Sequence, residues 1–456
     1  MIDPGEGTAL RSVATLPAGP FPGGRNRIWP VVRVAAGNCL EMYDFQIFGY
    51  YAAAIAATFF PSRNEFASLM ASLATFGAGF LMRPLGALLL GAYVDHRGRR
   101  AGLLLTLSLM AVGTFSIACT PSFAAIGLVA PLVVLAGRLI QGFSAGAENG
   151  GVSVYLSEIA TAGRKGFYVS WQTASQQVGV MGAALLGLLL TSCLSKDEMT
   201  RWGWRIPLFA GCAIIPLLFF LRRSLEETET FLARSHHPAL RDVMKTLAAN
   251  WRLVLLGVML ITTTTVYYYM ITAYTPTFGS VTLHLPYSKS MIVTLCVGAS
   301  NFFWLPLMGS LSDRIGRRPM LVGVAAVTLL TAYPALSWLT GAPSFVRLLE
   351  VELWFSFLFG GYTGAMIVFL TEIMPLEVRT TGFAFAYSCA TAAFGGSTPA
   401  ICTFLIHTTG NRAVPGLWLS FAAACGLIAS LLLSPERVAR ATVGCLTPAV
   451  PRSAGR

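Results

Sequence analysis

The sequence predicts an all-α integral membrane protein in which twelve transmembrane helices form two six-helix pseudo-repeat bundles. Three observations lead to this fold class. Of the 456 residues, 55% are hydrophobic and only 11% are charged, whereas soluble domains carry about 25% charged residues. The chain also contains twelve long apolar runs, and two loop motifs recur at a nearly constant offset. A water-soluble protein is therefore excluded before any functional residue is considered.

The predicted elements follow from the apolar runs, because a spanning helix needs about 20 mostly apolar residues. Runs bounded by charged residues, Gly and Pro occupy residues 31–59, 66–92, 102–120, 123–157, 167–192, 204–222, 251–276, 289–312, 319–340, 345–371, 382–406 and 414–433. Residues 1–30 lack the apolar core of a signal peptide, so we expect a cytoplasmic tail there. The other predicted parts are an N-terminal bundle at 31–222, a cytoplasmic linker at 223–250, a C-terminal bundle at 251–434 and a cytoplasmic tail at 435–456.

The loop charges predict the orientation of the helices. If the N-terminus lies inside, the inward loops and tails hold 22 of the 32 Lys and Arg residues. The outward loops hold seven: Arg63, Lys196, Arg201, Arg205, Lys289, Arg347 and Arg412. The last three lie within the predicted helices: Arg33, Arg83 and Arg138. Because cytoplasmic loops are enriched in positive charge, we expect an inner-membrane protein with both termini in the cytoplasm. The net charge of +12 then reflects orientation and anionic lipid rather than a nucleic-acid partner.

An internal repeat relates the two halves of the chain. The loops GAYVDHRGRR (91–100) and GSLSDRIGRR (309–318) both fit G-x-x-x-D-x-x-G-R-R at an offset of 218 residues. A second pair of loops, LSEIATAGRKGF (156–167) and LTEIMPLEVRTTGF (370–383), repeats at an offset of 214 residues. Parallel six-helix repeats with a substrate held between them are a transporter architecture.

These paired loops resemble the signature loops of the major facilitator superfamily, and the likeness covers residues 31–434. The stretch GNCLEMYDFQIFGYY (37–51) is similar to the metabolite:proton symporters of that superfamily. Two longer runs resemble the citrate and tricarballylate symporters: GFSAGAENGGVSVYLSEIATAGRKGFYVSWQTASQQVGV (142–180) and TTTTVYYYMITAYTPTFG (262–279). The resemblance implies the major facilitator fold and proton symport of a tricarboxylate by alternating access.

The charged loop residues resemble a latch that holds helices together on the cytoplasmic side in this superfamily. Charge pairs at such helix ends can form in one conformation and release in another. Small residues there are expected to allow close helix approach. Topology, lipid anchoring and surface solvation are the alternative explanations for these charges. The predicted gate residues are Gly91, Asp95, Arg99, Gly309, Asp313 and Arg317, with Glu158 and Glu372 as a second tier.

Five ionisable side chains are predicted inside the membrane, where a charge is costly and marks a functional candidate. Glu41 and Asp44 lie near mid-depth on the first helix, and their spacing puts both carboxylates on one face. Arg83 and Glu148 lie at a similar depth, and Arg138 lies further toward the outside. A carboxylate that exchanges an Arg partner for a proton can carry protons during transport. For this proton-carrying role we favour Asp44, then Glu41, then Glu148. A permanent salt-bridge cluster is the alternative.

The C-terminal half is predicted to contribute neutral polar groups. No comparable charge occurs at 251–308 or 355–370, and Asn301 stands 218 residues after Arg83. A guanidinium binds a carboxylate bidentately, and amides and hydroxyls can complete an anion site. Helix packing is the alternative for the hydroxyl-bearing residues. The predicted substrate-binding residues are Arg83, Arg138, Gln172, Gln176, Tyr267, Tyr268 and Asn301.

No catalytic, metal or cofactor site is predicted. Cysteines in apolar stretches lack metal-ligand spacing, and the five histidines are scattered. An embedded enzyme would need a catalytic motif, and a receptor would need an output domain larger than the linker. We expect an organic anion, a proton and membrane lipid as partners, no nucleic acid, and a functional monomer. Alternative substrates are a dicarboxylate, a shikimate-like acid, betaine or proline, and exchange or uniport are alternative modes.

Overall fold

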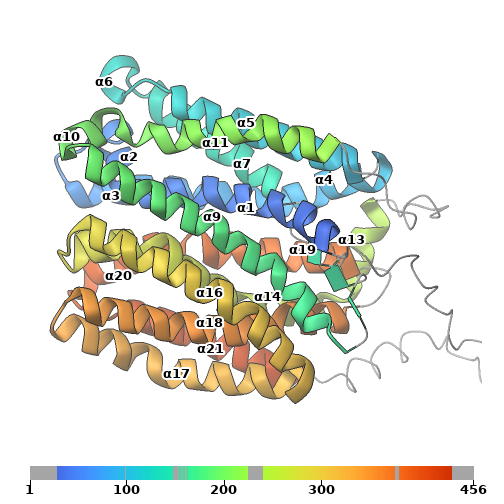
Figure 1. The fold of residues 1–456 in the computed structure, drawn as a ribbon. Coiled ribbons are helices and arrows are strands. Elements are labelled where there is room, and N and C mark those ends of the chain that lie inside the picture. Colours follow the sequence, from blue (N-terminus) through green and yellow to red (C-terminus); the bar gives the residue numbers. More distant parts are fainter. Residues whose placement is uncertain are drawn as a thin grey trace, which may run out of the picture.

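The computed structural model describes residues 28–97, 99–146, 163–223, 240–374 and 379–433, with a few positions between 147 and 162. Within these ranges the elements are α-helices and short π-helical segments, and no strand occurs. The long helices run side by side, with the N-terminal half (blue to green) above the C-terminal half (yellow to red) in Figure 1. The observed architecture is the all-α bundle that the apolar runs predict.

The N-terminal half contains all five ionisable residues predicted inside the membrane. Its α-helices are α1 (Ile28–Tyr50), α2 (Ala52–Phe59), α3 (Glu65–Leu81), α4 (Arg83–Arg97), α5 (Arg99–Cys119), α6 (Phe123–Ile126), α7 (Val129–Ala145), α9 (Lys165–Cys193), α10 (Lys196–Glu198) and α11 (Arg205–Arg223). A π-helical segment, η1 (Met199–Gly203), joins α10 to α11. The segment predicted as a linker contains a further helix, α13 (Leu240–Ala249).

The C-terminal half is likewise built of α-helices and short π-helical segments. Its elements are α14 (Trp251–Tyr268), η2 (Tyr269–Tyr274), α15 (Thr275–Thr277), η3 (Phe278–Thr282), α16 (Tyr287–Ile315), α17 (Arg317–Gly341), α18 (Phe345–Ile373), α19 (Arg379–Ala390), η4 (Thr391–Gly395), α20 (Thr398–Thr409) and α21 (Pro415–Leu432). The helix predicted to end at residue 276 therefore continues to Thr282 and contains π-helical turns, which occur frequently at functional sites.

Two predicted helices of the N-terminal half are divided by breaks near charged residues. The first is interrupted at Tyr51 and the second at Met82. Pro84 follows the second break, and proline lacks the N–H that would continue the helical hydrogen bonds. Arg83 therefore stands at the start of α4, directly after an interruption of the helix.

Eight helices of the described chain are long and apolar enough to cross a membrane. They are Glu65–Tyr93, Lys165–Cys193, Trp251–Thr282, Tyr287–Ile315, Arg317–Gly341, Phe345–Ile373, Gly382–Thr409 and Pro415–Leu432. Two shorter apolar helices, Leu104–Cys119 and Val129–Ala145, belong to α5 and α7. Together with α1 and α11, which lie beside them in Figure 1, these helices occupy the positions of the twelve predicted spans.

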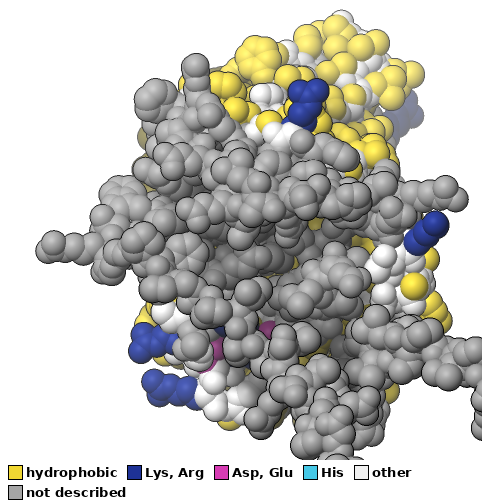
Figure 2. Space-filling model, turned by 90° about the vertical axis from the view of Figure 1, so that its right-hand side faces the viewer, with side chains coloured by type: hydrophobic (Ala, Val, Ile, Leu, Met, Phe, Trp, Pro, Cys, Tyr) yellow, Lys and Arg dark blue, Asp and Glu magenta, His cyan; other side chains and the backbone are white. Residues whose placement is uncertain are grey.

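The two halves meet along α9 and α16. A Cβ built on Gly166 would lie 2.2 Å from the Gly309 carbonyl oxygen, so the backbones touch at one end. At the other end, a Cβ on Gly187 would lie 3.3 Å from the sulfur of Met291. We call the end of the bundle that carries Asp313, at the right of Figure 1, the motif end. Figure 2 faces this end and shows Lys and Arg side chains around its described surface.

Candidate functional site

The site begins with a buried ion pair between α1 and α4. Arg83 Nη2 lies 3.3 Å from Glu41 Oε1, and both side chains are 1% exposed. The guanidinium carbon of Arg83 lies 4.7 Å from the ring centroid of Phe45 and 4.5 Å from that of Phe80. Arg83 Nε and Nη1 have no hydrogen-bond partner among the described residues. Two charged donors therefore remain available beside Glu41 for an anionic group.

The second buried guanidinium, Arg138 of α7, is held more completely by the protein. Its Nη1 donates to Gln141 Oε1 at 2.8 Å, and its Nη2 donates to the Phe76 carbonyl at 3.4 Å. Its guanidinium carbon also lies 4.7 Å from the centroid of the Phe45 ring. The guanidinium carbons of Arg83 and Arg138 are both 4.7 Å from the centroid of the Phe45 ring. The two carbons are therefore separated by no more than twice that distance. The structure thus brings the two predicted cations together.

Asp44 is joined to Arg138 by a chain of hydrogen bonds rather than by a direct ion pair. The Thr114 hydroxyl lies 2.7 Å from Asp44 Oδ2, and Gln141 Nε2 donates to that hydroxyl at 2.8 Å. Gln141 in turn accepts from Arg138. The other oxygen, Asp44 Oδ1, points toward α11, where a Cβ built on Gly211 would lie 2.6 Å away. Glu41 and Asp44 therefore contact different helices, although their spacing predicts one shared face.

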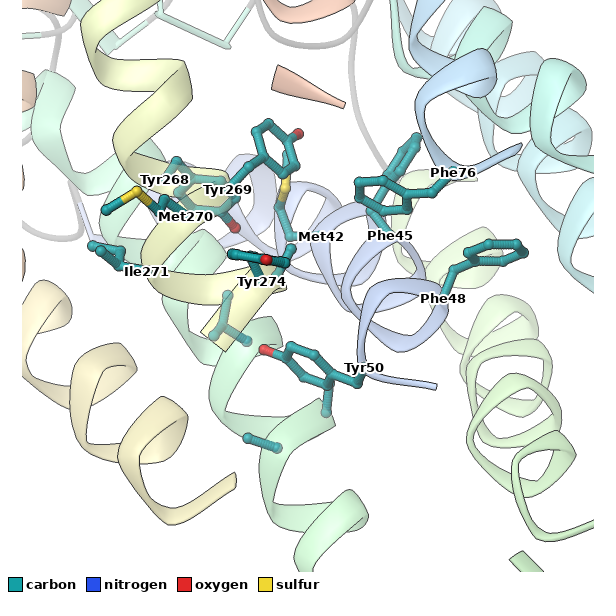
Figure 3. Close-up of a cluster of buried hydrophobic side chains, with 14 of the residues drawn as sticks. Met42, Phe45, Phe48, Tyr50, Phe76, Tyr268, Tyr269, Met270, Ile271 and Tyr274 are labelled. Carbon is teal, nitrogen blue, oxygen red and sulfur yellow. The ribbon is translucent and has the colours of Figure 1, made fainter. Parts of the chain in front are cut away.

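The facing surface of the C-terminal half is built by the end of α14 and by η2. Gln46 Nε2 of α1 donates to the Tyr268 hydroxyl at 3.3 Å and to Thr272 Oγ1 at 3.1 Å. The Tyr269 ring packs edge-on against Phe80, with centroids 5.1 Å apart. Figure 3 shows Tyr268 and Tyr269 on the side of their helix that faces α1, and Phe45 and Phe48 on the side of α1 toward Phe76. Sequence reasoning identified Tyr268 but not its partner Gln46.

Tyr267 lies away from this surface. Its hydroxyl shares a hydrogen bond of 2.7 Å with Thr328 of α17, and its ring packs against Phe355 of α18. Successive side chains of a helix point about 100° apart, so the neighbours Tyr267 and Tyr268 serve different surfaces. The prediction that Tyr267 binds substrate has no support from its position in this conformation, because its side chain is packed inside the C-terminal half.

The predicted amide ligands lie along the contact between α9 and α16. Asn301 Nδ2 donates to Gln177 Oε1 at 3.1 Å, and Ser356 Oγ lies 2.7 Å from Asn301 Oδ1. Gln172 accepts a hydrogen bond from Ser153, and Gln176 is 3% exposed. Both ends of the Asn301 amide are thus engaged by protein groups in this conformation, where Asn301 joins the two halves.

The loop motif of the C-terminal half also joins the two halves. Asp313 Oδ1 and Oδ2 accept hydrogen bonds from the backbone N–H groups of Gly166 and Phe167, at 2.9 and 3.1 Å. These N–H groups open α9, and a carboxylate is favoured at the positive end of a helix. Arg317 Nη2 pairs with Asp313 and lies 3.6 Å from Glu372 Oε1. Asp313 therefore connects its own half to the first turn of a helix in the other half.

Gly309 and Gly91 behave differently, although they occupy equivalent positions of the repeat. A Cβ on Gly309 would lie 2.5 Å from the Gly166 carbonyl oxygen, so α9 and α16 approach each other closely there. A Cβ on Gly91 would meet no described atom within 4 Å. Among the described residues, the structure therefore gives no support for the expected close approach at Gly91.

Several predicted site residues lie outside the described parts of the chain. Glu148 and Glu158 are among them, and the side chains of Asp95 and Arg99 are not described. Within the described residues, no group of three or more His, Cys, Asp and Glu side chains could hold a metal ion. The site consists of buried arginines, carboxylates, amides and hydroxyls.

Sequence reasoning missed one buried carboxylate in the C-terminal half. Glu352 of α18 is 6% exposed and lies 2.9 Å from Thr275 Oγ1. The prediction placed no comparable charge at 251–308 or 355–370, and Glu352 lies just outside both ranges. The signal was present in the sequence, since Glu352 lies inside the predicted helix 345–371, but Glu350 and Arg347 made this end resemble a solvated helix start.

A protein-family model described as Major Facilitator Superfamily matches residues 34–398. The chain belongs to the major facilitator superfamily. Among solved structures, this major facilitator protein is similar to a D-xylose-proton symporter, with a TM-score of 0.69, 18% identity, and coverage of 88% of this chain and 96% of that chain. A partially occluded inward open conformation of the xylose transporter XylE from E. coli gives a TM-score of 0.70 at 18% identity, covering 88% and 95%. At this identity the likeness supports the fold alone.

Curated relatives of this major facilitator protein are much closer in sequence. It is 58% identical over 410 residues to a citrate-proton symporter of Klebsiella pneumoniae, covering 90% of this chain and 92% of the relative. A citrate-proton symporter of Salmonella typhi is 57% identical over 403 residues, covering 88% and 93%. An alpha-ketoglutarate permease of Escherichia coli (strain K12) is 31% identical over 414 residues, covering 90% and 94%.

Proposed function

We propose that this major facilitator protein is a proton symporter of citrate or tricarballylate. The observation that carries the proposal is the buried Arg83, which uses one nitrogen for Glu41 and keeps Nε and Nη1 without a partner among the described residues. A second guanidinium, Arg138, lies on the same Phe45 ring. Paired guanidinium groups suit a polycarboxylate, and two of the relatives reported above are named citrate-proton symporters, which agrees with that substrate.

Asp44 is the residue that we favour for proton coupling. Thr114 Oγ1 lies 2.7 Å from Asp44 Oδ2 and 3.0 Å from the Met110 carbonyl, but a hydroxyl has one hydrogen. An ionised Asp44 takes that hydrogen. A protonated Asp44 donates to Thr114 instead, and Thr114 then donates to Met110. The proton state of Asp44 thus changes the group to which Thr114 donates, and Thr114 is linked to Arg138 through Gln141.

Glu41 and Glu148 are proposed to assist this coupling. Glu41 neutralises Arg83 while the site is empty, and an arriving carboxylate competes with Glu41 for the same guanidinium. Burial in a low dielectric favours the protonated form of a carboxylate whose cation is withdrawn. Substrate binding at Arg83 and protonation of Glu41 therefore support each other.

Alternating access is proposed to break one set of contacts between the halves while the other set forms. At the motif end, Asp313 binds the first turn of α9. Gln46 binds Tyr268 and Thr272 nearer the opposite end. Opening toward one side of the membrane then requires loss of the hydrogen bonds on that side only. Asn301 and Gln172 or Gln176 are proposed to contact substrate once the contact between α9 and α16 opens.

The positive charges of the loops support an orientation with the motif end and both termini in the cytoplasm. In this orientation, residues 31–222 and 251–434 form the two rocking bundles, and 223–250 is the cytoplasmic linker. We propose that a single chain embedded in inner-membrane lipid is sufficient for transport, because the arginines and the facing tyrosines all come from one chain.

Uptake into proteoliposomes tests the proposal. Labelled citrate and tricarballylate are offered under an inward proton gradient, with and without a protonophore. Accumulation that requires the gradient supports symport. Uptake that is unchanged by the protonophore would indicate exchange or another coupling ion. Absence of uptake by folded protein would refute citrate and tricarballylate as substrates.

A smaller carboxylate is the second candidate substrate, since the alpha-ketoglutarate permease is a relative at 31% identity. The two buried arginines favour an anion over a zwitterion such as betaine or proline. Competition of labelled citrate by alpha-ketoglutarate, and not by betaine, would separate these alternatives. Equal competition by betaine would contradict the assignment of Arg83 and Arg138 as ligands of an anionic substrate.

A further inference from the structure

Glu352 forms a second buried carboxylate site, remote from Arg83 and Arg138. It lies near the start of α18, away from the motif end, and is 6% exposed. Its Oε1 lies 2.9 Å from Thr275 Oγ1, and its Oε2 has no hydrogen-bond partner among the described residues. No cation within salt-bridge distance is found for it in the described chain. An ionised carboxylate in this position would be costly, because burial of a charge requires a partner.

The hydroxyl of Thr275 shows how a proton would satisfy the site. Thr275 Oγ1 lies 2.9 Å from Glu352 Oε1 and 3.3 Å from the Met270 carbonyl oxygen. One hydroxyl hydrogen cannot fully satisfy both acceptors. If Glu352 is protonated, its O–H donates to Thr275, and Thr275 donates to Met270. The hydroxyl hydrogens of Glu352 and Thr275 and the Met270 carbonyl then each have a partner without any movement of the backbone.

The same arrangement occurs at Asp44 in the other half. There, Thr114 Oγ1 lies 2.7 Å from the carboxylate and 3.0 Å from the Met110 carbonyl of its own helix. In both places a threonine hydroxyl stands between a buried carboxyl group and a carbonyl of its own helix. The two halves therefore each contain a site in which one proton reverses the direction of a hydrogen bond.

Charged groups on the elements around α18 lie elsewhere. Lys289 at the start of α16 is exposed, and its Nζ lies 5.1 Å from the centroid of the Phe345 ring. Glu350 on α18 is exposed, and Arg347 Nη1 donates to the Trp338 carbonyl. The remaining charged residues of the packed helices lie at the motif end, where these helices begin or end: Lys165, Arg252, Asp313, Arg314, Arg317, Arg318, Glu372 and Arg379. Titratable tyrosines and cysteines on the same elements are Tyr168, Tyr267, Tyr268, Tyr269, Tyr274, Tyr287, Tyr333, Tyr362, Tyr387, Cys193, Cys296 and Cys389.

The helical segment that Glu352 touches also faces the N-terminal half. Thr275 directly follows η2, the π-helical stretch Tyr269–Tyr274. Within η2, Thr272 accepts a hydrogen bond from Gln46, and the Tyr269 ring packs against Phe80. A change in the hydrogen bond between Thr275 and the Met270 carbonyl thus acts on the stretch that meets the other half.

We propose that Glu352 binds a second proton in the C-terminal half, and that this proton sets the hydrogen bonding of η2 where it contacts α1. The proposal rests on the proposed function, since it adds a coupled proton to the symport cycle. Protonated Glu352 stabilises the contact of η2 with Gln46. Loss of the proton withdraws the Thr275 hydrogen from the Met270 carbonyl and weakens this contact.

Transport by Glu352→Gln tests this proposal. The amide of Gln donates to Thr275 as the protonated acid would, so the variant is expected to fold and to bind citrate. One coupled proton fewer lowers the citrate accumulation ratio by about tenfold for each pH unit of gradient. Glu350→Gln, on the exposed side of the same helix, is the control and should accumulate citrate like the wild type. Wild-type accumulation and an unchanged proton-to-citrate ratio in Glu352→Gln would overturn the proposal.

A second measurement does not depend on citrate transport. Hydrophobic carbodiimides react with protonated carboxyl groups inside the membrane, and mass spectrometry of peptides locates the adduct. Labelling of Glu352 that falls as pH rises supports the proposal, even if the wild type transports no citrate and the proposed function fails. Absence of labelling at every pH, or labelling independent of pH, would show that Glu352 does not exchange a proton and would overturn the proposal.

Discussion

Replacement of Gly309 by Ala tests whether the contact between α9 and α16 must form during transport. A Cβ at this position would lie 2.5 Å from the Gly166 carbonyl oxygen and 2.8 Å from Ser170 Oγ. Ordinary contact begins at 3.4 Å, so the two helices would have to separate by about 1 Å to accommodate the methyl group. The nearest obstacle is backbone, which cannot rotate away as a side chain can.

The magnitude follows from the cost of overpacking, which is about 1–3 kcal/mol. Only the conformation in which α9 and α16 are in contact at the motif end bears this cost. The population of that conformation should therefore fall by about 5- to 150-fold relative to the open one. Transport needs both conformations, so the initial rate of citrate uptake should fall while the free energy of unfolding changes by no more than the overpacking cost.

The assay combines citrate uptake with the accessibility of a cysteine introduced at Ser312, which is buried beside this contact. In a cysteine-free background, Gly309→Ala should increase labelling of that cysteine by a hydrophilic thiol reagent. Gly91→Ala is the matched control, because it occupies the same position of the repeat and a Cβ there would meet no described atom within 4 Å. Unchanged uptake and unchanged labelling in Gly309→Ala would refute the reasoning.

Three further predictions concern the buried polar network. Asp44→Asn should abolish proton-driven accumulation of citrate while counterflow exchange continues; driven uptake at the wild-type level would contradict the assignment. Arg83→Gln leaves Glu41 buried without its cation and should lower the free energy of unfolding by about 3–5 kcal/mol. Adding Glu41→Gln should restore the melting temperature but not citrate binding by calorimetry, and wild-type affinity in the double variant would exclude Arg83 as a substrate ligand. Gln46→Leu removes two hydrogen bonds, each contributing about 1 kcal/mol, and should expose a cysteine introduced at Tyr50; unchanged labelling would show that these bonds do not hold the halves together.

The pairing of Glu41 with Arg83 illustrates how far the sequence leads. Their depths in two different helices follow from counting residues, and a buried charge needs a partner, so the sequence favours such a pair. The chain from Asp44 through Thr114 and Gln141 to Arg138 could not be predicted. Threonine and glutamine are common in membrane helices as packing residues, and nothing in their spacing along the chain indicates which helix they face.

Tyr267 and Tyr268 show the limit most directly. Both are adjacent tyrosines in one apolar helix, and sequence reasoning assigned them the same role. In the structure one hydroxyl contacts Thr328 and the other accepts from Gln46. Glu352 shows the opposite case, since its charge was visible in the sequence but its burial was not.

Hydropathy and motif spacing are properties of local chain segments, so they are enough to predict the twelve apolar spans, the repeat of the two halves and the residue types inside the membrane. Which of those residues meet depends on the tertiary structure, because the rotation of each helix about its axis is set by packing against helices distant in the chain. Gly309 shows this: a Cβ there would lie 2.5 Å from the Gly166 carbonyl oxygen of the other half, whereas a Cβ on its repeat counterpart Gly91 would meet no described atom within 4 Å.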